Sequence, residues 1–281
     1  MPLAEIPSPA RDLWHLGPVP LRAQELAIVA GIVVAIVIAD RRYRFAGGPR
    51  GVITDVAAWA VPAGLVIAAV GEAADRAHGV PWPAVHTADS ILGFPGAVAL
   101  GTVAAWFACR RVRPPERLAF APVLYAAAPA IAFGNAVAQL GDWFAQQGFG
   151  RPSSVPWAVA ISAAHRPQGY ENFATFTPIF LYQAIWDVTA GIAVILVARR
   201  LGLRGDRVFA LGAIAYAAGG FALFWLGIGH LPIILGLRAG ELGDAVVLVG
   251  AVAYLVRTHR TRTRSIQSPH KPTLERDSPV M

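Results

Sequence analysis

The polar segment at residues 138–187 carries most of the side chains that could do chemistry. It is rich in Gly, Pro and aromatic residues and lies between long apolar runs. Irregular backbone cannot face lipid tails, because each unpaired N–H or C=O group there costs several kcal/mol. The segment must therefore cap a membrane bundle at the water interface or line a cavity within it. Either place suits chemistry on a lipid headgroup.

The rest of the chain has the composition of the membrane helices that would position this segment. The 281 residues are 56% hydrophobic and only 15% charged, whereas soluble domains carry about 25% charge. Apolar runs of about 20 residues, long enough to cross a bilayer, recur along the chain. We expect an all-α polytopic membrane protein with seven transmembrane helices, at residues 21–39, 52–70, 91–108, 118–140, 178–198, 208–228 and 242–256.

The distribution of basic residues predicts the orientation. Most of the 24 Lys and Arg residues lie in four segments, at residues 40–51, 109–117, 199–207 and after 256. These segments follow the first, third, fifth and seventh expected spans, and the alternate loops hold few basic residues. By the positive-inside rule the N-terminus is outside and the C-terminus is cytoplasmic. The net charge of +7 therefore reflects topology, and we expect no nucleic-acid partner.

Several other features limit the interpretation. Residues 1–20 lack a basic region leading into an apolar core, so we expect no cleaved signal peptide. The single cysteine, Cys109, excludes an intrachain disulfide, and the seven histidines show no metal-ligand spacing. We expect no metal and no cofactor.

Residues 1–257 are interpreted as one membrane domain and residues 258–281 as a polar, disordered cytoplasmic tail.

Two motifs carry a resemblance to a known family. Residues 141–157 include GDWFAQQGFGRP and SSVPW, and residues 166–187 read RPQGYENFATFTPIFLYQAIWD. Together with residues 6–23 and 234–256, they resemble the prolipoprotein diacylglyceryl transferase family, particularly its actinobacterial branch. The resemblance extends to about residue 257, and that family also has seven spans with the N-terminus outside.

The resemblance implies a reaction and its partners. The family moves the diacylglyceryl group of phosphatidylglycerol onto the thiol of the lipobox cysteine of a preprolipoprotein, and glycerol phosphate leaves. This implies a multi-pass protein of the bacterial plasma membrane that binds phosphatidylglycerol or another anionic phospholipid. A buried phosphodiester needs arginine or comparable donors, and the attacking thiol needs a base.

The chain departs from the family pattern where charge is needed. The family's Arg and Asn in G-R-x-G-N fall on Gln139 and Asp142, and a following Glu falls on Gln147. The His and Glu of H-P-x-F-L-Y-E become Thr177 and Gln183. Scaffold glycines, prolines and aromatics remain. Charged residues within membranes are costly and usually functional, so their loss leaves catalysis open. The alternatives are an enzyme of this family and an impaired paralogue that binds lipid or lipoprotein, or assists an active transferase.

Eight residues are candidates for the site that the resemblance implies. Asp142 could be a base for the thiol, and Gln139 could act beside it; Asp142 could equally be an interfacial helix-end charge. Asn135 and Gln139 lie one helical turn apart and share a face, where they could line a polar cleft or join helices. The candidates for substrate binding are Arg151, Asn135, Gln147, Tyr170, Tyr182 and Gln183. Arg151 and Tyr182 could instead be interfacial anchors.

Two further features have ordinary alternatives. Asp187 lies about one turn below Gln183, and if it is buried it needs a partner. His165 and Arg166, with Tyr170 and Glu171, could read a peptide substrate or could form a structured surface turn.

Overall fold

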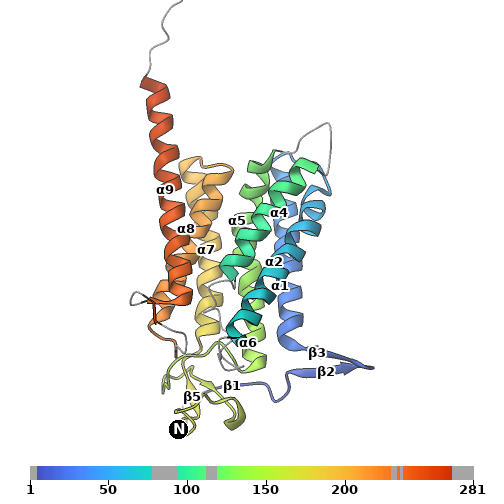
Figure 1. Cartoon of the computed structure of the whole chain (residues 1–281), viewed down its shortest axis with the longest axis vertical. Coiled ribbons are helices and arrows are strands. Elements are labelled where there is room, and N and C mark those ends of the chain that lie inside the picture. Colours follow the sequence, from blue (N-terminus) through green and yellow to red (C-terminus); the bar gives the residue numbers. More distant parts are fainter. Residues whose placement is uncertain (1–4, 78–93, 112–118, 229–232, 235–236, 268–281) are drawn as a thin grey trace, which may run out of the picture.

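The computed structural model describes residues 5–77, 94–111, 119–228, 233–234 and 237–267 of the 281-residue chain. Within them the chain is mostly helical, and its long helices run roughly side by side (Figure 1). These helices are α1 (Ala23–Phe45), α2 (Val52–Ala77), α4 (Phe94–Arg111), α5 (Phe120–Ala138), α7 (Ile179–Leu201), α8 (Asp206–Phe224) and α9 (Ala239–Gln267). A short helix, α6 (Leu140–Ala145), follows α5 almost directly.

Five stretches of the described helices are long and apolar enough to cross a membrane, which confirms an all-α membrane protein. They are Ala23–Phe45, Val52–Val70, Phe120–Ala145, Ile179–Arg200 and Asp206–Leu223. Helices α4 and α9 are not among these five, although each overlaps an expected span. The described part of α4 ends on Arg110 and Arg111, which lowers its mean hydropathy. Seven long helices are present among the described residues, and five of them contain candidate spans, so the count of seven spans remains a prediction.

Helix ends differ from the sequence expectation for local reasons. Helix α1 continues to Phe45, because its last turn is basic and favourable at a helix C-terminus, and Arg44 pairs with Asp40 at 2.8 Å. Helix α7 ends at Leu201, because the next residue, Gly202, has a φ of 60°, the left-handed conformation that glycine adopts readily. Helix α9 runs past residue 257 to Gln267, so the chain stays helical at the start of the expected tail.

Close packing of small residues joins α1 to α5. A Cβ added at Gly134 would lie 2.6 Å from the backbone oxygen of Gly31 and 2.9 Å from the Cβ of Ala35. Only glycine permits this approach of two backbones, which is how small residues bring membrane helices together. Helix α1 therefore lies against α5 as one pair, while α2 and α4 form a second pair.

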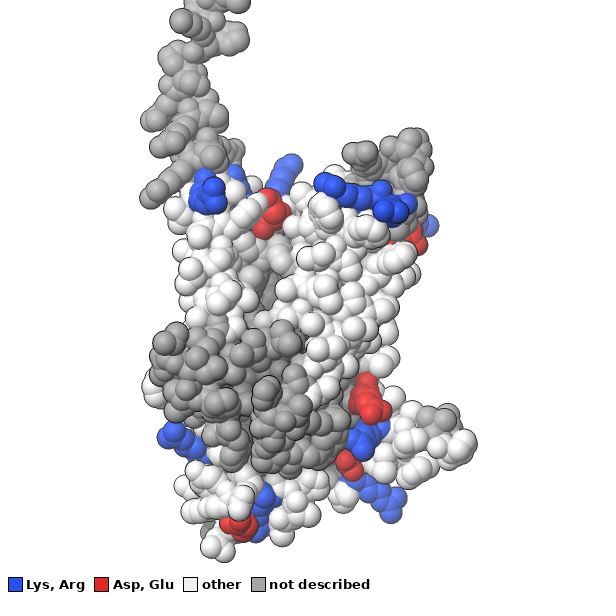
Figure 2. All heavy atoms as spheres, in the orientation of Figure 1, with Lys and Arg blue, Asp and Glu red and all other residues white. Residues whose placement is uncertain are grey.

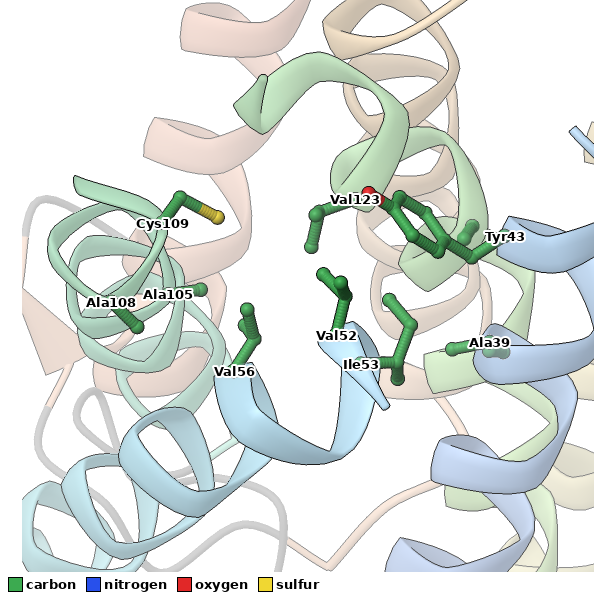
Figure 3. Close-up of a cluster of buried hydrophobic side chains, with 11 residues drawn as sticks. Ala39, Tyr43, Val52, Ile53, Val56, Ala105, Ala108, Cys109 and Val123 are labelled. Atoms are coloured by element: carbon green, nitrogen blue, oxygen red, sulfur yellow. The ribbon is translucent and has the colours of Figure 1, made fainter. Parts of the chain in front are cut away.

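An apolar cluster joins the two pairs at one end of the bundle (Figure 3). Tyr43 of α1, Val52 and Val56 of α2, Cys109 of α4 and Val123 of α5 are all almost fully buried there. This is the end where the α1–α2 connection lies, and we refer to it as the far end. The cluster fixes all four helices relative to one another there.

Short strands cover the opposite end, which we refer to as the strand end (Figure 1). A three-stranded sheet has the order β1 (Ile6–Pro7), β4 (Val159–Ala160) and β5 (Thr175–Phe176), with β1 parallel to β4 and β4 antiparallel to β5. Two antiparallel hairpins are β2 (Leu13–Leu16) with β3 (Val19–Arg22) and β6 (Ile233–Ile234) with β7 (Leu237–Arg238). The sheet joins the N-terminal residues to the polar segment at residues 138–187, a contact that the sequence pattern does not predict.

Charge is confined to the two ends of the molecule in the face that Figure 2 presents. Lys, Arg, Asp and Glu atoms appear near the far end and near the strand end, and the described surface between them is free of them. Exposed apolar side chains cover the helices instead, including Val33, Val66, Val103 and Ile192. Such a band is what a helix bundle presents to lipid tails.

Candidate functional site

A cavity of about 520 Å³ lies between the α1–α5 pair and the α2–α4 pair. Its lining on α1 runs from Gln24 to Ala39, which corresponds to about 22 Å of helix. Most of the lining is Ala, Val, Ile, Leu and Gly. The far-end cluster supplies Ala39, Ile53 and Val123 to the lining, so the cavity ends there against packed apolar side chains.

The strand end of this cavity is polar. Gln24, Asn135, Gln139 and Asp142 line it there, and Asp142 is the only charged side chain among the described lining residues. The predicted shared face of Asn135 and Gln139 is confirmed, since both residues line the same cavity. An apolar chamber with a few polar groups at one end matches an amphiphilic ligand better than a small polar solute.

A group that we name the strand-end cluster consists of Gln24, Asp142 and Gln147. The Nε2 atom of Gln24 donates to Oδ1 of Asp142 at 3.1 Å and to Oε1 of Gln147 at 3.5 Å. The first helix thus contacts the polar segment across 118 positions of sequence. Sequence reasoning found Asp142 and Gln147 but did not choose Gln24 as a site residue, because a glutamine at the start of an apolar span gives no signal of its own.

A sharp turn after α6 brings Gln147 beside Asp142. Gln146 has φ of 52° and Gly148 has φ of 61°, so the chain reverses immediately after Ala145. The backbone N–H of Gln147 donates to the backbone oxygen of Asp142 at 2.8 Å. A Cβ at position 148 would lie 2.9 Å from Oδ2 of Asp142, so glycine is required there both by backbone angle and by space.

A second group, which we name the mid-bundle cluster, consists of Asn135, Gln183 and Asp187. Asp187 is only 1% exposed. Its Oδ2 atom accepts from Nδ2 of Asn135 at 2.7 Å, and its Oδ1 atom accepts from Nε2 of Gln183 at 3.0 Å. These bonds supply the partner that a buried carboxylate requires. Asn135 and Asp187 also line a smaller cavity of about 80 Å³, so Asn135 lies between the two cavities.

The other predicted site residues lie near the strand end of the bundle and line neither of the two cavities. The backbone N–H of Arg151 donates to the oxygen of Leu226 at 2.9 Å, while its side chain is exposed. Tyr182 accepts a hydrogen bond from Nε1 of Trp157 at 2.6 Å. Tyr170 packs against the apolar cluster around Phe176. The structure therefore separates Arg151, Tyr170 and Tyr182 from the residues that it gathers at the cavity.

The loop that follows β4 is held by its own hydrogen bonds. Arg166 donates from Nε to the oxygen of Ile161 at 3.1 Å and from Nη1 to the oxygen of Glu171 at 2.9 Å. Ser162 and His165 share a hydrogen bond of 2.8 Å. Bonds from the backbone N–H groups of Glu171 itself and of Gly169 lower the pKa of the Glu171 carboxyl. The arrangement favours a structured surface turn over a site for peptide.

No group of three or more His, Cys, Asp or Glu side chains among the described residues could hold a metal ion. What the bundle offers is a carboxylate and neutral amides at one end of an apolar chamber.

The fold and the cavity define a helical membrane protein with an apolar hollow between its helices that suits an amphiphile. Residues 11–257 match the sequence model of the prolipoprotein diacylglyceryl transferase family. The chain belongs to that family, as the motifs in its polar segment indicated, and is a multi-pass protein of the bacterial plasma membrane.

Individual relatives agree with this placement. The phosphatidylglycerol–prolipoprotein diacylglyceryl transferase 2 of Streptomyces coelicolor is 40% identical over 243 residues, which cover 84% of this chain and 75% of that protein. The transferase of Mycolicibacterium paratuberculosis is 41% identical over 240 residues, with 79% of this chain and 55% of the relative covered. That of Frankia alni is 39% identical over 243 residues, with 84% and 63% covered. The chain thus spans between about half and three quarters of these relatives.

Proposed function

We propose that this chain transfers a diacylglyceryl group from a phospholipid to the lipobox cysteine of a preprolipoprotein. The observation that carries the proposal is the family match over residues 11–257 together with the chamber that ends at Gln24 and Asp142. The names of the relatives give phosphatidylglycerol as the lipid donor, and it is the first donor to test.

Residues of this chain can supply the proton acceptor and the hydrogen-bond donors that the reaction needs. The thiol loses its proton to the Asp142 carboxylate, and the sulfur attacks the glycerol carbon that bears the phosphate. A carbon–sulfur bond forms, the bond from that carbon to the phosphate oxygen breaks, and the headgroup phosphate leaves with the electron pair. Gln139 lines the same end of the cavity, and Asn135 keeps one amide hydrogen besides the one that Asp187 accepts. Both are proposed as neutral donors for the charge that grows on the leaving oxygen.

We also propose the topology that this reaction needs. The strand end faces the exterior, the far end faces the cytoplasm, and α4 and α9 cross the membrane with the five candidate spans. The proposal is supported by the basic residues at the C-terminal ends of α1, α4 and α7, since arginine gathers on the cytoplasmic side. The polar stretch of residues 258–281 remains a proposed cytoplasmic tail that begins as helix.

The names of the relatives favour the transferase, and one observation bears on the alternative that the sequence left open. Among the described residues that line the large cavity there is no Arg, Lys or His. A phosphate group that leaves with negative charge is usually stabilised by such cations. The chain would then bind a lipid or lipoprotein, or assist an active transferase, without turning over lipid itself.

One assay separates the two functions. The purified chain is incubated with acyl-labelled phosphatidylglycerol and a lipobox peptide, and the peptide is analysed by mass spectrometry for the added thioether-linked diacylglyceryl group. Transfer that depends on the peptide cysteine and falls in Asp142→Ala supports the enzyme. Retention of labelled lipid with unmodified peptide, under conditions where a relative transfers the label, supports the binding protein.

A further inference from the structure

The mid-bundle cluster connects a buried carboxylate to the wall of the large cavity. Asp187 of α7 is only 1% exposed, so water does not compete for its oxygens. Asn135 of α5 donates from Nδ2 to Oδ2 of Asp187 at 2.7 Å, and Asn135 also lines the large cavity. Asp187 lines the smaller cavity and is not among the described residues that line the larger one. The amide of Asn135 thus lies between the carboxylate and the large cavity.

The Asp187 carboxylate determines which way the Asn135 amide points. An amide side chain can turn by half a rotation, which exchanges its oxygen and its nitrogen. A carboxylate accepts hydrogen bonds and repels another oxygen, so only the orientation with Nδ2 toward Asp187 is stable. One amide hydrogen is used in that bond and the second remains. Because both hydrogens lie in the plane of the amide, fixing the first also fixes the direction of the second.

The carboxylate is itself held in place by its own helix. Gln183, one helical turn before Asp187 on α7, donates from Nε2 to Oδ1 at 3.0 Å. Both oxygens of Asp187 are thus occupied, and the carboxylate cannot rotate without losing a hydrogen bond where no water replaces it. Asp187 therefore reaches a ligand in the large cavity only through Asn135.

Gln139 places a second donor beside Asn135. The two residues are four positions apart and both line the large cavity. At this spacing their Cβ atoms are about 5–6 Å apart, so both amides can donate to oxygens of one phosphate group. An Asn135 amide turned the other way would present its oxygen, which repels a phosphate. The orientation that Asp187 imposes is the one that suits an anionic phospholipid.

We infer that Asp187 is a positioning residue, which holds the Asn135 amide so that its second N–H donates to the phosphate of a phospholipid in the large cavity. The inference rests on the proposed function only in placing that phosphate at the polar end of the cavity. Asp187 itself touches neither lipid nor peptide. Its loss lowers turnover more than lipid binding, because the donor matters most while negative charge grows on the leaving oxygen.

A double-mutant cycle on turnover tests whether Asp187 acts through Asn135. Asp187→Asn keeps the shape of the side chain but leaves one acceptor for two amides. We expect kcat to fall about tenfold and KM for phosphatidylglycerol to stay within about twofold. In an Asn135→Ala background the same change should lower kcat no further, because the group through which Asp187 acts is already gone.

Asp40→Asn is the matched control for this cycle. It makes the same change at a carboxylate that pairs with Arg44 and does not line the cavity, so kcat should stay at the parent value. An equal fall in kcat from Asp187→Asn with and without Asn135 would leave Asp187 with a structural role only and would overturn the inference. A parent-like kcat in Asp187→Asn would overturn it as well.

Side-chain NMR tests the same inference without relying on turnover. The chain has only two asparagines, Asn135 and the exposed Asn172, so labelling the asparagine side-chain nitrogens gives two pairs of signals. Phosphatidylglycerol should shift the Asn135 pair and leave the Asn172 pair in place. Asp187→Ala should abolish the shift, and Asp187→Leu replaces it if the smaller side chain prevents folding. An Asn135 pair that the lipid does not move, or that moves equally without Asp187, contradicts the inference.

The inference and the proposed function fail in different ways. Transfer from phosphatidylglycerol to the peptide, with an Asn135 pair that the lipid does not move, overturns the inference and supports the enzyme. A lipid-dependent shift of the Asn135 pair that requires Asp187, with no transfer by the parent chain, supports the inference and leaves the chain as a binding protein.

Discussion

The strand-end cluster and the mid-bundle cluster contain the same chemistry in different surroundings. Each has one carboxylate and two amide side chains, contributed by two or more segments of the chain. In the mid-bundle cluster both oxygens of Asp187 accept hydrogen bonds and the side chain is almost fully buried. In the strand-end cluster Asp142 lies at the end of a cavity of about 520 Å³.

The difference shows that residue type alone does not distinguish a structural network from a ligand site. A buried carboxylate whose oxygens are both occupied has little left to offer a ligand, and its partners are needed for stability. A carboxylate at the end of a large apolar chamber keeps lone pairs for something that enters the chamber. Asn135 belongs to both regions, because it bonds Asp187 and lines the larger cavity.

The largest effect on stability is expected from Asp187→Ala. The change leaves the amide nitrogens of Asn135 and Gln183 without their acceptor inside the bundle, at a cost of about 3 kcal/mol in the free energy of unfolding. Thermal unfolding in detergent measures the change. Val188→Ala, at an exposed neighbour, is the control and should stay within about 0.5 kcal/mol of the parent. A loss no greater than that of the control would show that the mid-bundle cluster is not a structural network.

An intermediate effect is expected from Gly148→Ala, because the added methyl group strains the backbone and meets Asp142. Gly202→Ala is the matched control, since its φ of 60° is nearly that of Gly148 and nothing lies within 4 Å of its Cβ position. Both variants lose about 1 kcal/mol from the left-handed conformation. Only Gly148→Ala should also reduce lipid retention, measured on the purified proteins. Equal lipid retention in the two variants would show that Asp142 takes no part in binding the lipid.

The smallest effect is expected from Arg151→Ala. The backbone of Arg151 is fixed by Leu226 and Thr177, but its side chain is exposed and outside the cavity lining. We expect a stability change within about 0.5 kcal/mol and a slight weakening of anionic-lipid binding at the surface. Lipid competition in detergent at two salt concentrations measures it. A loss of all lipid retention in Arg151→Ala would place the headgroup site around Arg151 and not in the cavity.

The sequence predicted the helices better than the contacts between them. Apolar runs of bilayer length located every long helix to within a few residues at its start, because the pattern is local. The helical spacing of Asn135 and Gln139 predicted their shared face for the same reason. The sequence also marked Asp187 as needing a partner, and Gln183 was the residue one turn away.

Contacts over long distances in the chain were not predictable. Gln24 donates a hydrogen bond to Asp142 across 118 positions of sequence. Ile6 of β1 pairs with Val159 of β4, although each of these strands is only two residues long. Such contacts depend on how the helices pack against one another. Neither the hydrophobic pattern of the sequence nor the secondary-structure propensity of its residues encodes them. The left-handed conformation of Gln146 is a further example, since nothing in the residue type requires it.

The central claim is that a diacyl lipid occupies the chamber between the α1–α5 pair and the α2–α4 pair. Irradiation of the chain with a phospholipid that carries a photoreactive group in its acyl chain, followed by peptide mass spectrometry, tests it most directly. The account predicts that cavity-lining residues such as Ile32 and Ile131 are labelled at lipid concentrations too low to label the exposed Ile192 of α7. Labelling of Ile192 at equal or lower concentrations, with Ile32 and Ile131 unlabelled, would contradict it.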